Sequence, residues 1–135
     1  QAFDIDRGNL YGASATECVL FIPQDVVSEN ELAFVRYDDN SRSPGHVLVV
    51  PRRPVAIFFG MTVDEKHAVL SLLDQAKEFI EKQHKPNGYN IGANIGVAGG
   101  QSRIHVHVHL IPRYHGDHAD PKGGVRCVLA GKCSS

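Results

Sequence analysis

Strict alternation of apolar and polar residues is the most regular pattern in the chain. Between residues 104 and 110, apolar side chains alternate with the three histidines His105, His107 and His109. A β-strand directs residues i, i+2 and i+4 to one side, with about 6.8 Å for each two residues, whereas i and i+2 do not face each other on a helix. The pattern predicts a strand with one apolar face toward the core and an opposite face that carries three imidazoles.

A second pattern, in which apolar residues recur at steps of three and four, predicts one long helix. Thr62 and Glu65 fit a capping box, and the helix that they open is expected to reach about residue 85. Its two histidines, His67 and His84, are expected on the surface. One apolar stripe is expected to pack on a sheet, and it consists of Val69, Leu70, Leu73, Ala76, Phe79 and Ile80.

The whole pattern predicts a single α+β domain that spans residues 1–135. An irregular arm at 1–13 and a short helix at 13–21 come first, and a C-terminal tail at 116–135 comes last. Further strands are expected at 24–28, 31–37, 46–50 and 89–95. The order of three strands, long helix, strand, loop and strand favours a largely antiparallel sheet with the one long helix packed on it.

Composition narrows the classes of protein that fit this domain. A length of 135 residues with 42% hydrophobic residues suffices for one core. A net charge of −1 without a basic cluster argues against nucleic acid as a partner. The three cysteines are odd in number and irregularly spaced, which favours a reducing, cytoplasmic location over a disulfide framework. No apolar run reaches the roughly 18 residues of a membrane span, so no membrane partner is expected.

Three interpretations of the histidine face are open on the residues alone. It could be a solvated strand face, a metal site in which a His-x-His pair binds zinc, or a site of covalent catalysis on phosphorus. The loop that precedes it, residues 96–102, favours phosphorus. Its glycines, including Gly100, allow backbone N–H groups to turn toward an anion, and Gln101 and Ser102 add side-chain donors. Such a site needs no protein-bound metal, and none is expected.

Together these motifs resemble the histidine triad family of nucleotide hydrolases and transferases, whose signature is His-x-His-x-His followed by apolar residues. His46 lies in a Pro-Gly-His strand similar to that of the family, and Asn94 stands eleven residues before His105. The resemblance spans about residues 30–118. The fragile histidine triad branch, which hydrolyses dinucleoside polyphosphates, is most similar in the segments Arg52-Arg-Pro-Val55, Pro112-Arg113 and Gly116-Asp117.

The resemblance implies a catalytic role for each histidine. His107 would attack the α-phosphorus and form a nucleotidyl-imidazole, which water then cleaves. A neutral imidazole, with an unperturbed pKa near 6.5, needs no metal for this attack. His46 and His105 would hold the tautomer of His107 by hydrogen bonds. His109 would bind the non-bridging oxygens, on which charge develops in the transition state.

The resemblance also implies how the substrate and a partner chain bind. Asn94 and residues 100–102 would contact the phosphate, and Asp38, eight residues before His46, would bind the ribose hydroxyls. No tightly bound cofactor is implied, and Mg²⁺ carried by a polyphosphate substrate could neutralise the leaving group. Phe21 stands where zinc-binding members of the family have a second cysteine after Cys18, so no structural zinc is expected. Dimeric members of the family imply a homodimer.

The resulting hypothesis is a nucleotide hydrolase that cleaves dinucleoside polyphosphates at the α-phosphate and releases a nucleoside monophosphate. An adenosine phosphoramidase is the alternative within the same chemistry. A non-catalytic nucleotide-binding module and a metalloenzyme are alternatives of different classes. His115 and His118 could reach distal phosphates, although a solvated loop is the favoured interpretation for both and for Tyr114.

Overall fold

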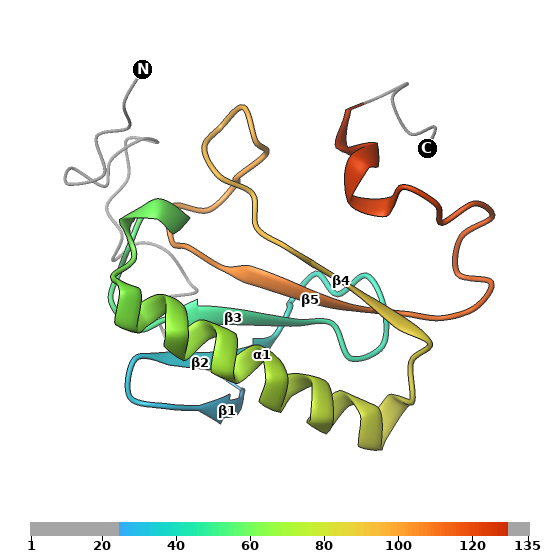
Figure 1. The fold of residues 1–135 in the computed structure, drawn as a ribbon, viewed down its shortest axis with the longest axis horizontal. Helices are drawn as coiled ribbons and strands as arrows, with labels where there is room; N and C mark the ends of the chain where they lie inside the picture. Colours follow the sequence, from blue (N-terminus) through green and yellow to red (C-terminus); the bar gives the residue numbers. More distant parts are fainter. Residues whose placement is uncertain (1–24, 130–135) are drawn as a thin grey trace.

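The computed structural model describes residues 25–129 and shows a five-stranded antiparallel sheet with one long helix on it (Figure 1). The strand order is β1-β2-β3-β5-β4, and all four described pairings are antiparallel. The predicted α+β class is confirmed, while the predicted arm at 1–13 and helix at 13–21 lie outside the described residues. The elements are β1 (Val26–Glu29), β2 (Ala33–Tyr37), β3 (Val47–Pro51), η3 (Phe58–Gly60), α1 (Val63–His84), β4 (Gly88–Gly92), β5 (Val108–Arg113) and η4 (Gly124–Val128).

Helix α1 begins and ends as the sequence predicts. Thr62 Oγ1 accepts a hydrogen bond from the Glu65 amide at 3.1 Å, and Glu65 Oε1 accepts one from the Thr62 amide at 2.8 Å, which completes the capping box. Lys85 ends the helix in the left-handed conformation, with φ of 50°. No helix within residues 25–129 is both long and apolar enough to cross a membrane.

Two details of the predicted helix surface are wrong. Leu70 is 59% exposed, and Leu72 is fully buried in its place. At 3.6 residues per turn, position 72 lies on the same side as Val69 and Ala76, whereas position 70 is turned away from them. His67 is exposed as expected, but His84 is half-buried beside the turn at Gly45.

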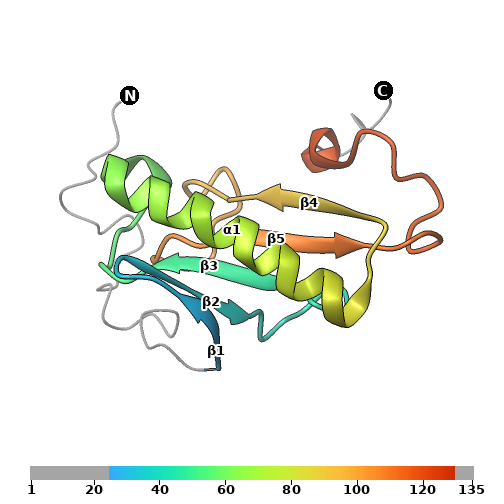
Figure 2. The same ribbon diagram turned by 60° about the horizontal axis from the view of Figure 1, so that its bottom comes forward.

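Apolar side chains pack against both faces of the sheet. One cluster fills the space between the sheet and α1, which covers one face in Figure 2. A smaller cluster lies on the opposite face and consists of Phe34, Leu48, Val50, Ala56, Ile57 and Ile104. The central strand β3 is buried on both faces for this reason, and it is a nearly continuous apolar run rather than an alternating one.

The histidine segment is a strand over only part of its predicted length. Strand β5 begins at Val108, and the β3–β5 ladder stops at the pair Val49–Val108. Pro51, at the end of β3, has no N–H with which to extend that ladder. Preceding residues instead run beside the segment after β3, where the Val106 amide donates to the Val55 carbonyl at 2.8 Å. Strand β4 is also shorter than predicted, since it ends at Gly92 rather than at residue 95.

Candidate active site

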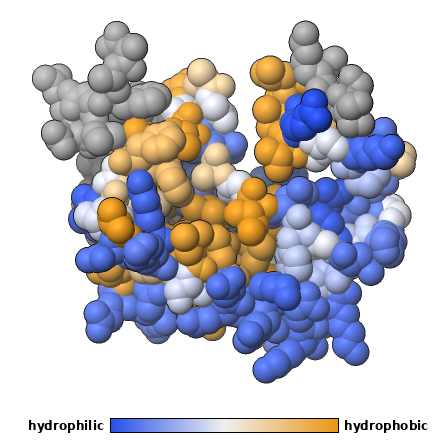
Figure 3. Space-filling view, in the orientation of Figure 1, coloured by the Kyte–Doolittle hydropathy of each residue, from blue (hydrophilic) through white to orange (hydrophobic). Residues whose placement is uncertain are grey.

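A cavity of about 600 Å³ brings together the histidines His46, His107 and His109. Its size falls in the usual range for small-molecule sites, roughly 300–1,000 Å³. Asp38, Asn94 and Ser102 also line it, whereas three other predicted site residues are absent from its lining, namely Gly100, Gln101 and His105. Figure 3 shows a hollow between the segment that contains η4 and the body of the domain.

His107 has its tautomer fixed by the backbone. Its Nδ1 lies 2.9 Å from the carbonyl oxygen of His105, and a carbonyl can only accept, so Nδ1 carries the proton. The lone pair is therefore on Nε2. The ring is 8% exposed, and burial lowers the pKa of His107, which keeps it neutral at pH 7. This is the protonation state that a nucleophilic imidazole needs.

His105 supports this arrangement from within the core. The ring is fully buried, and its Nε2 donates to the Pro51 carbonyl at 2.9 Å. Burial lowers the pKa of His105, so this ring is also neutral. The ring thereby fixes the position of its own backbone carbonyl, which accepts from His107. The predicted effect of His105 on His107 is thus exerted through the main chain.

His46 pairs with His109, whereas the family resemblance implied that it would hold His107. The Arg42 amide donates to Nδ1 of His46 at 3.0 Å, which leaves the proton of the neutral ring on Nε2. That Nε2 lies 2.9 Å from Nδ1 of His109 and donates to it. His109 in turn carries its own proton on Nε2. Burial is the main cause that lowers the pKa of His109 to about 4, followed by the neighbouring His107 and His46.

Asp38 lies beside this imidazole pair. Its Oδ2 is 3.3 Å from Nε2 of His46 and 3.7 Å from Nδ1 of His109, and its Oδ1 accepts from the Asn40 amide at 2.9 Å. The carboxylate partly offsets the burial of both rings, because it favours their protonated forms. A role in binding ribose, as predicted, would add to these contacts.

The same three residues are the group in the described chain with the most evident metal-binding geometry. Ligand atoms of Asp38, His46 and His109 lie within 4.8 Å of one another. The donor set would suit zinc or another divalent transition metal. However, the Arg42 amide occupies the lone pair of Nδ1 on His46, and the proton on Nε2 must leave before that atom can bind a metal. The observed hydrogen bonds therefore favour a proton-carrying pair over a metal centre.

The loop at 96–102 shapes the cavity but uses most of its polar groups internally. Gln101 is buried, accepts from the Gly96 amide at 2.9 Å and donates to the carbonyl oxygens of Ala56 and Arg103 at 2.7 and 2.8 Å. The amides of Gly99, Gly100 and Gln101 donate to carbonyls within the loop. Gln101 thus stabilises the loop and is absent from the cavity lining, whereas the sequence predicted that it would contact the substrate.

Two of the predicted polar residues line the cavity beside this loop, Asn94 just before it and Ser102 at its end. A Cβ atom added at Gly100 would lie 3.8 Å from Cγ of Asn94, so the loop packs directly against this amide. The cation Arg103 also lines the cavity and was missed in the sequence. Its position next to Ser102 was a signal for it, because a guanidinium close to a phosphate loop suits an anionic substrate.

The fold and the cavity define a class of small α+β domains that bring several neutral histidines together in one cavity. The HIT domain model matches residues 20–116, and the chain belongs to the HIT family, as the sequence motifs predicted.

Several relatives have similar sequences. A HIT-like protein from Methanocaldococcus jannaschii is 41% identical over 96 residues, which cover 71% of this chain and 74% of the relative. The AP-4-A phosphorylase of Mycobacterium tuberculosis is 34% identical over 93 residues, 68% of this chain. An asymmetrical bis(5'-nucleosyl)-tetraphosphatase from Schizosaccharomyces pombe is 39% identical over 77 residues, 57% of this chain. The matched regions are 48% and 42% of the two named enzymes, so the chain spans about half of their length.

Solved structures show the same fold. A HIT family protein from Bacillus anthracis superposes with a TM-score of 0.72 and 28% identity, over 77% of this chain and 78% of that one. A HIT family member from Bacillus subtilis superposes with a TM-score of 0.68 and 27% identity, over 74% of this chain and 75% of that one.

Proposed function

We propose that the protein cleaves dinucleoside polyphosphates at the α-phosphate through a covalent intermediate on His107 and releases a nucleoside monophosphate. One observation carries this proposal: the His105 carbonyl holds the proton of His107 on Nδ1, which leaves Nε2 as a neutral nucleophile in a ring that lines the cavity. The names of the M. tuberculosis and S. pombe relatives, which denote enzymes of dinucleoside tetraphosphates, support this substrate class.

The first step forms a bond between Nε2 of His107 and the α-phosphorus and breaks the anhydride bond to the leaving oxygen. His109 donates a hydrogen bond from Nε2 to that oxygen and keeps its proton, while Mg²⁺ carried by the substrate neutralises the charge of the leaving group. Asn94 and Ser102 hold the non-bridging oxygens, on which charge develops. In the second step water attacks the same phosphorus, the P–N bond breaks and restores neutral His107, and the proton that the water loses passes to solvent.

A phosphoramidate is a second candidate substrate, and the imidazole pair favours it. An amine leaves phosphorus only when it is protonated, and the hydrogen-bond chain from Arg42 through His46 places a proton on the cavity-facing side of His109. Turnover of adenosine phosphoramidate and of diadenosine tetraphosphate by one preparation compares the two substrates. Reactions with and without inorganic phosphate distinguish hydrolysis from phosphorolysis, because phosphorolysis yields a nucleoside diphosphate in place of one monophosphate.

Substitution of His107 by asparagine tests the catalytic assignment. Asparagine keeps a donor near the His105 carbonyl but lacks a nucleophilic nitrogen, so we expect kcat to fall by about three orders of magnitude or more. His67→Asn, on the exposed side of α1, is the matched control and is expected to retain full activity. Intact-protein mass spectrometry after rapid acid-free quenching should show one nucleotidyl group on the wild-type chain. Unchanged turnover by the His107 variant would refute the mechanism.

The family supports two further parts of this proposal, a homodimer and a cytoplasmic location. Light scattering coupled to size-exclusion chromatography measures the molar mass, and a monomer at micromolar concentration would contradict the dimer.

A further inference from the structure

The cavity extends beyond the catalytic histidines along the outer face of the sheet. Alternate β5 residues, His109, Ile111 and Arg113, are partly exposed and line it, while the residues between them are buried. The four residue steps from His109 to Arg113 span about 13 Å along the strand. On the neighbouring strand, Asn90 pairs with Ile111 and also lines the cavity. The histidines therefore occupy one part of a longer groove.

This groove has two sides, because β5 lies between β3 and β4 in the sheet. Asp38, His46 and Leu48 line it on the β3 side, and residues 90–94 line it on the β4 side. An in-line displacement places the nucleophile and the leaving group on opposite sides of the phosphorus. The leaving group departs on the side of the phosphorus opposite Nε2 of His107, and with the nucleoside of the reacting nucleotide near Asp38 the β4 side of the groove is free to receive it.

The β4 side is closed by residues 118–128, which we call the C-terminal wall. His118, Lys122, Val125 and Val128 of this wall line the cavity. Its helix η4 packs on β4, since a Cβ atom added at Gly124 would lie 3.3 Å from Nδ2 of Asn90. The wall thus belongs to the same groove as the histidines, although it follows them in the chain.

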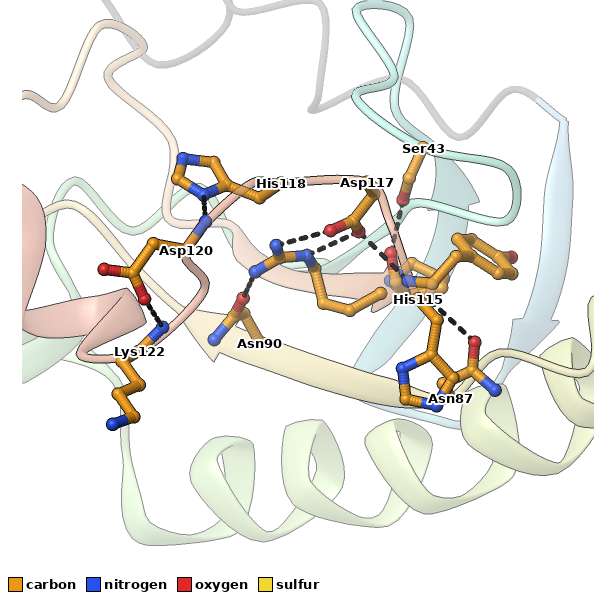
Figure 4. Close-up of polar contacts among 11 residues, drawn as sticks. Ser43, Asn87, Asn90, His115, Asp117, His118, Asp120 and Lys122 are labelled. Atoms are coloured by element: carbon orange, nitrogen blue, oxygen red, sulfur yellow. Dashed lines mark hydrogen bonds and ion pairs between the residues drawn. The ribbon is translucent and has the colours of Figure 1, made fainter.

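An ion pair fixes the start of this wall to the sheet. Arg113 donates from Nε and Nη2 to the two carboxylate oxygens of Asp117, each at 2.8 Å, and from Nη1 to Oδ1 of Asn90 at 2.6 Å (Figure 4). Asp117 also accepts from the Tyr114 amide at 3.0 Å. Bidentate pairs of this kind define an orientation, which a single point charge does not. The wall is therefore held at a set distance from β4.

We infer that the C-terminal wall is a leaving-group subsite for a second nucleoside joined through an anionic phosphate linker, and that Arg113 and Asp117 position it. This inference rests on the proposed function and specifies its substrate. Lys122 supplies a cation for the linker. His118 adds an N–H donor, because its Nδ1 accepts from the Asp120 amide at 3.0 Å and the proton of the neutral ring is on Nε2.

The apolar part of the wall suits a base. Val125 and Val128 are 61% and 80% exposed, and Ile111 contributes to the floor of the groove. A flat aromatic base can cover such side chains and bury apolar area that water otherwise contacts. A small leaving group such as ammonia would reach neither these residues nor Lys122, and this difference provides the test.

Binding of two ligands to positioning variants measures the subsite without turnover. The ligands are adenosine monophosphate and a non-hydrolysable methylene analogue of diadenosine tetraphosphate, titrated by calorimetry into wild type, Arg113→Lys and Asp117→Asn. We expect each variant to bind the dinucleotide about tenfold more weakly, and the monophosphate less than about threefold more weakly, because only the longer ligand reaches the wall. Arg52→Lys, which alters an ion pair with Glu29 at the far edge of the sheet, is the matched control and should leave both affinities unchanged.

Equal weakening of both ligands, or no weakening of either, would overturn the subsite, as would a wild-type protein that binds the dinucleotide no better than the monophosphate. Thermal unfolding of each variant establishes that it is folded under the conditions of titration. Failure of the proposed function has a different signature, in which wild type binds both ligands as expected but does not hydrolyse diadenosine tetraphosphate.

Discussion

At the scale of single residues, the site is a set of imidazoles whose protons are assigned by their neighbours. The His105 carbonyl determines the tautomer of His107, and the Arg42 amide determines that of His46 and, through it, that of His109. A backbone amide can only donate and a carbonyl can only accept, so these assignments do not depend on side-chain charge. The proposed nucleophile His107 and the proposed donor His109 thus have their protons placed before any substrate binds.

The glycines of the loop at 96–102 offer a test at this scale. A Cβ atom at Gly99 would lie 2.4 Å from the Ile95 carbonyl oxygen, so Gly99→Ala must displace the loop and with it Asn94 and Ser102. We expect catalytic efficiency to fall about 10- to 100-fold with the fold retained. Gly88→Ala is the control, because nothing lies within 4 Å of its added Cβ. Full activity of the Gly99 variant in steady-state assays would show that the loop does not position the phosphate.

The histidine spacing predicted that His107 and His109 belong to one site, but it could not predict that the His105 ring is buried in the core or which partners the three rings have. His105, His107 and His109 follow from local alternation alone. The pairing of His46 with His109 depends on the β3–β5 register, and its proton depends on a turn at Arg42, neither of which is written in a local pattern. Gln101 was misassigned because a buried amide and a substrate-facing amide look alike in a loop sequence.

At the scale of elements, one ion pair connects α1 to the segment after β3. Arg53 donates from Nη2 and Nε to the two carboxylate oxygens of Glu65 at 2.8 and 3.0 Å. Glu65 is 4% exposed and also completes the capping box. Its pKa is lowered chiefly by the hydrogen bond from Arg53. The helix start is therefore tied to the chain that lies two residues beyond Pro51, the acceptor of His105.

Glu65→Gln separates these two functions of the side chain. Glutamine retains the capping box but not the ionic pairing, so we expect the free energy of unfolding to fall by about 1–3 kcal/mol. Asp64→Asn, one residue earlier and exposed, is the control and should change stability by less than about 0.5 kcal/mol. Urea unfolding measures both, and equal effects of the two substitutions would contradict a special role for the Arg53 pair.

At the scale of the whole molecule, burial of neutral histidines makes folding depend on pH. The pKa of His109 is lowered to about 4, while an unfolded histidine titrates near 6.5. Between these values the unfolded chain binds more protons, so stability is fully present above about pH 6.5 and is lost as the pH falls toward 4. The buried rings of His46, His105 and His107 shift in the same direction.

Urea unfolding at pH 7.0 and at pH 5.0 tests this dependence. We expect His109 alone to account for a loss on the order of 2 kcal/mol between the two values. In His109→Gln the loss should be smaller by about that amount, whereas His67→Gln, at an exposed position on α1, should behave as wild type. The same pH dependence in wild type and in the His109 variant would mean that the ring titrates normally in the folded state.

The types and order of the elements could be predicted, whereas the position of the segment after β5 could not. The capping box, the order of elements along the chain and the largely antiparallel sheet follow from local patterns, and each is confirmed. The position of residues 118–128 over the groove could not be predicted, because it depends on an ion pair between Arg113 and Asp117 that also engages Asn90 from another strand. Short polar segments carry no periodicity from which a tertiary contact could be inferred.

Pro51 shows how a residue that interrupts regular structure can serve chemistry. In an antiparallel ladder the N–H and C=O of one residue point to the same neighbouring strand. Pro51 has no N–H to pair there, and its carbonyl accepts from the imidazole of His105 instead. Any other amino acid at position 51 would have a backbone N–H, which could donate to the neighbouring strand and extend the β3–β5 ladder by one pair. The end of the ladder at Pro51 thus holds the ring of His105, whose own carbonyl determines the tautomer of His107.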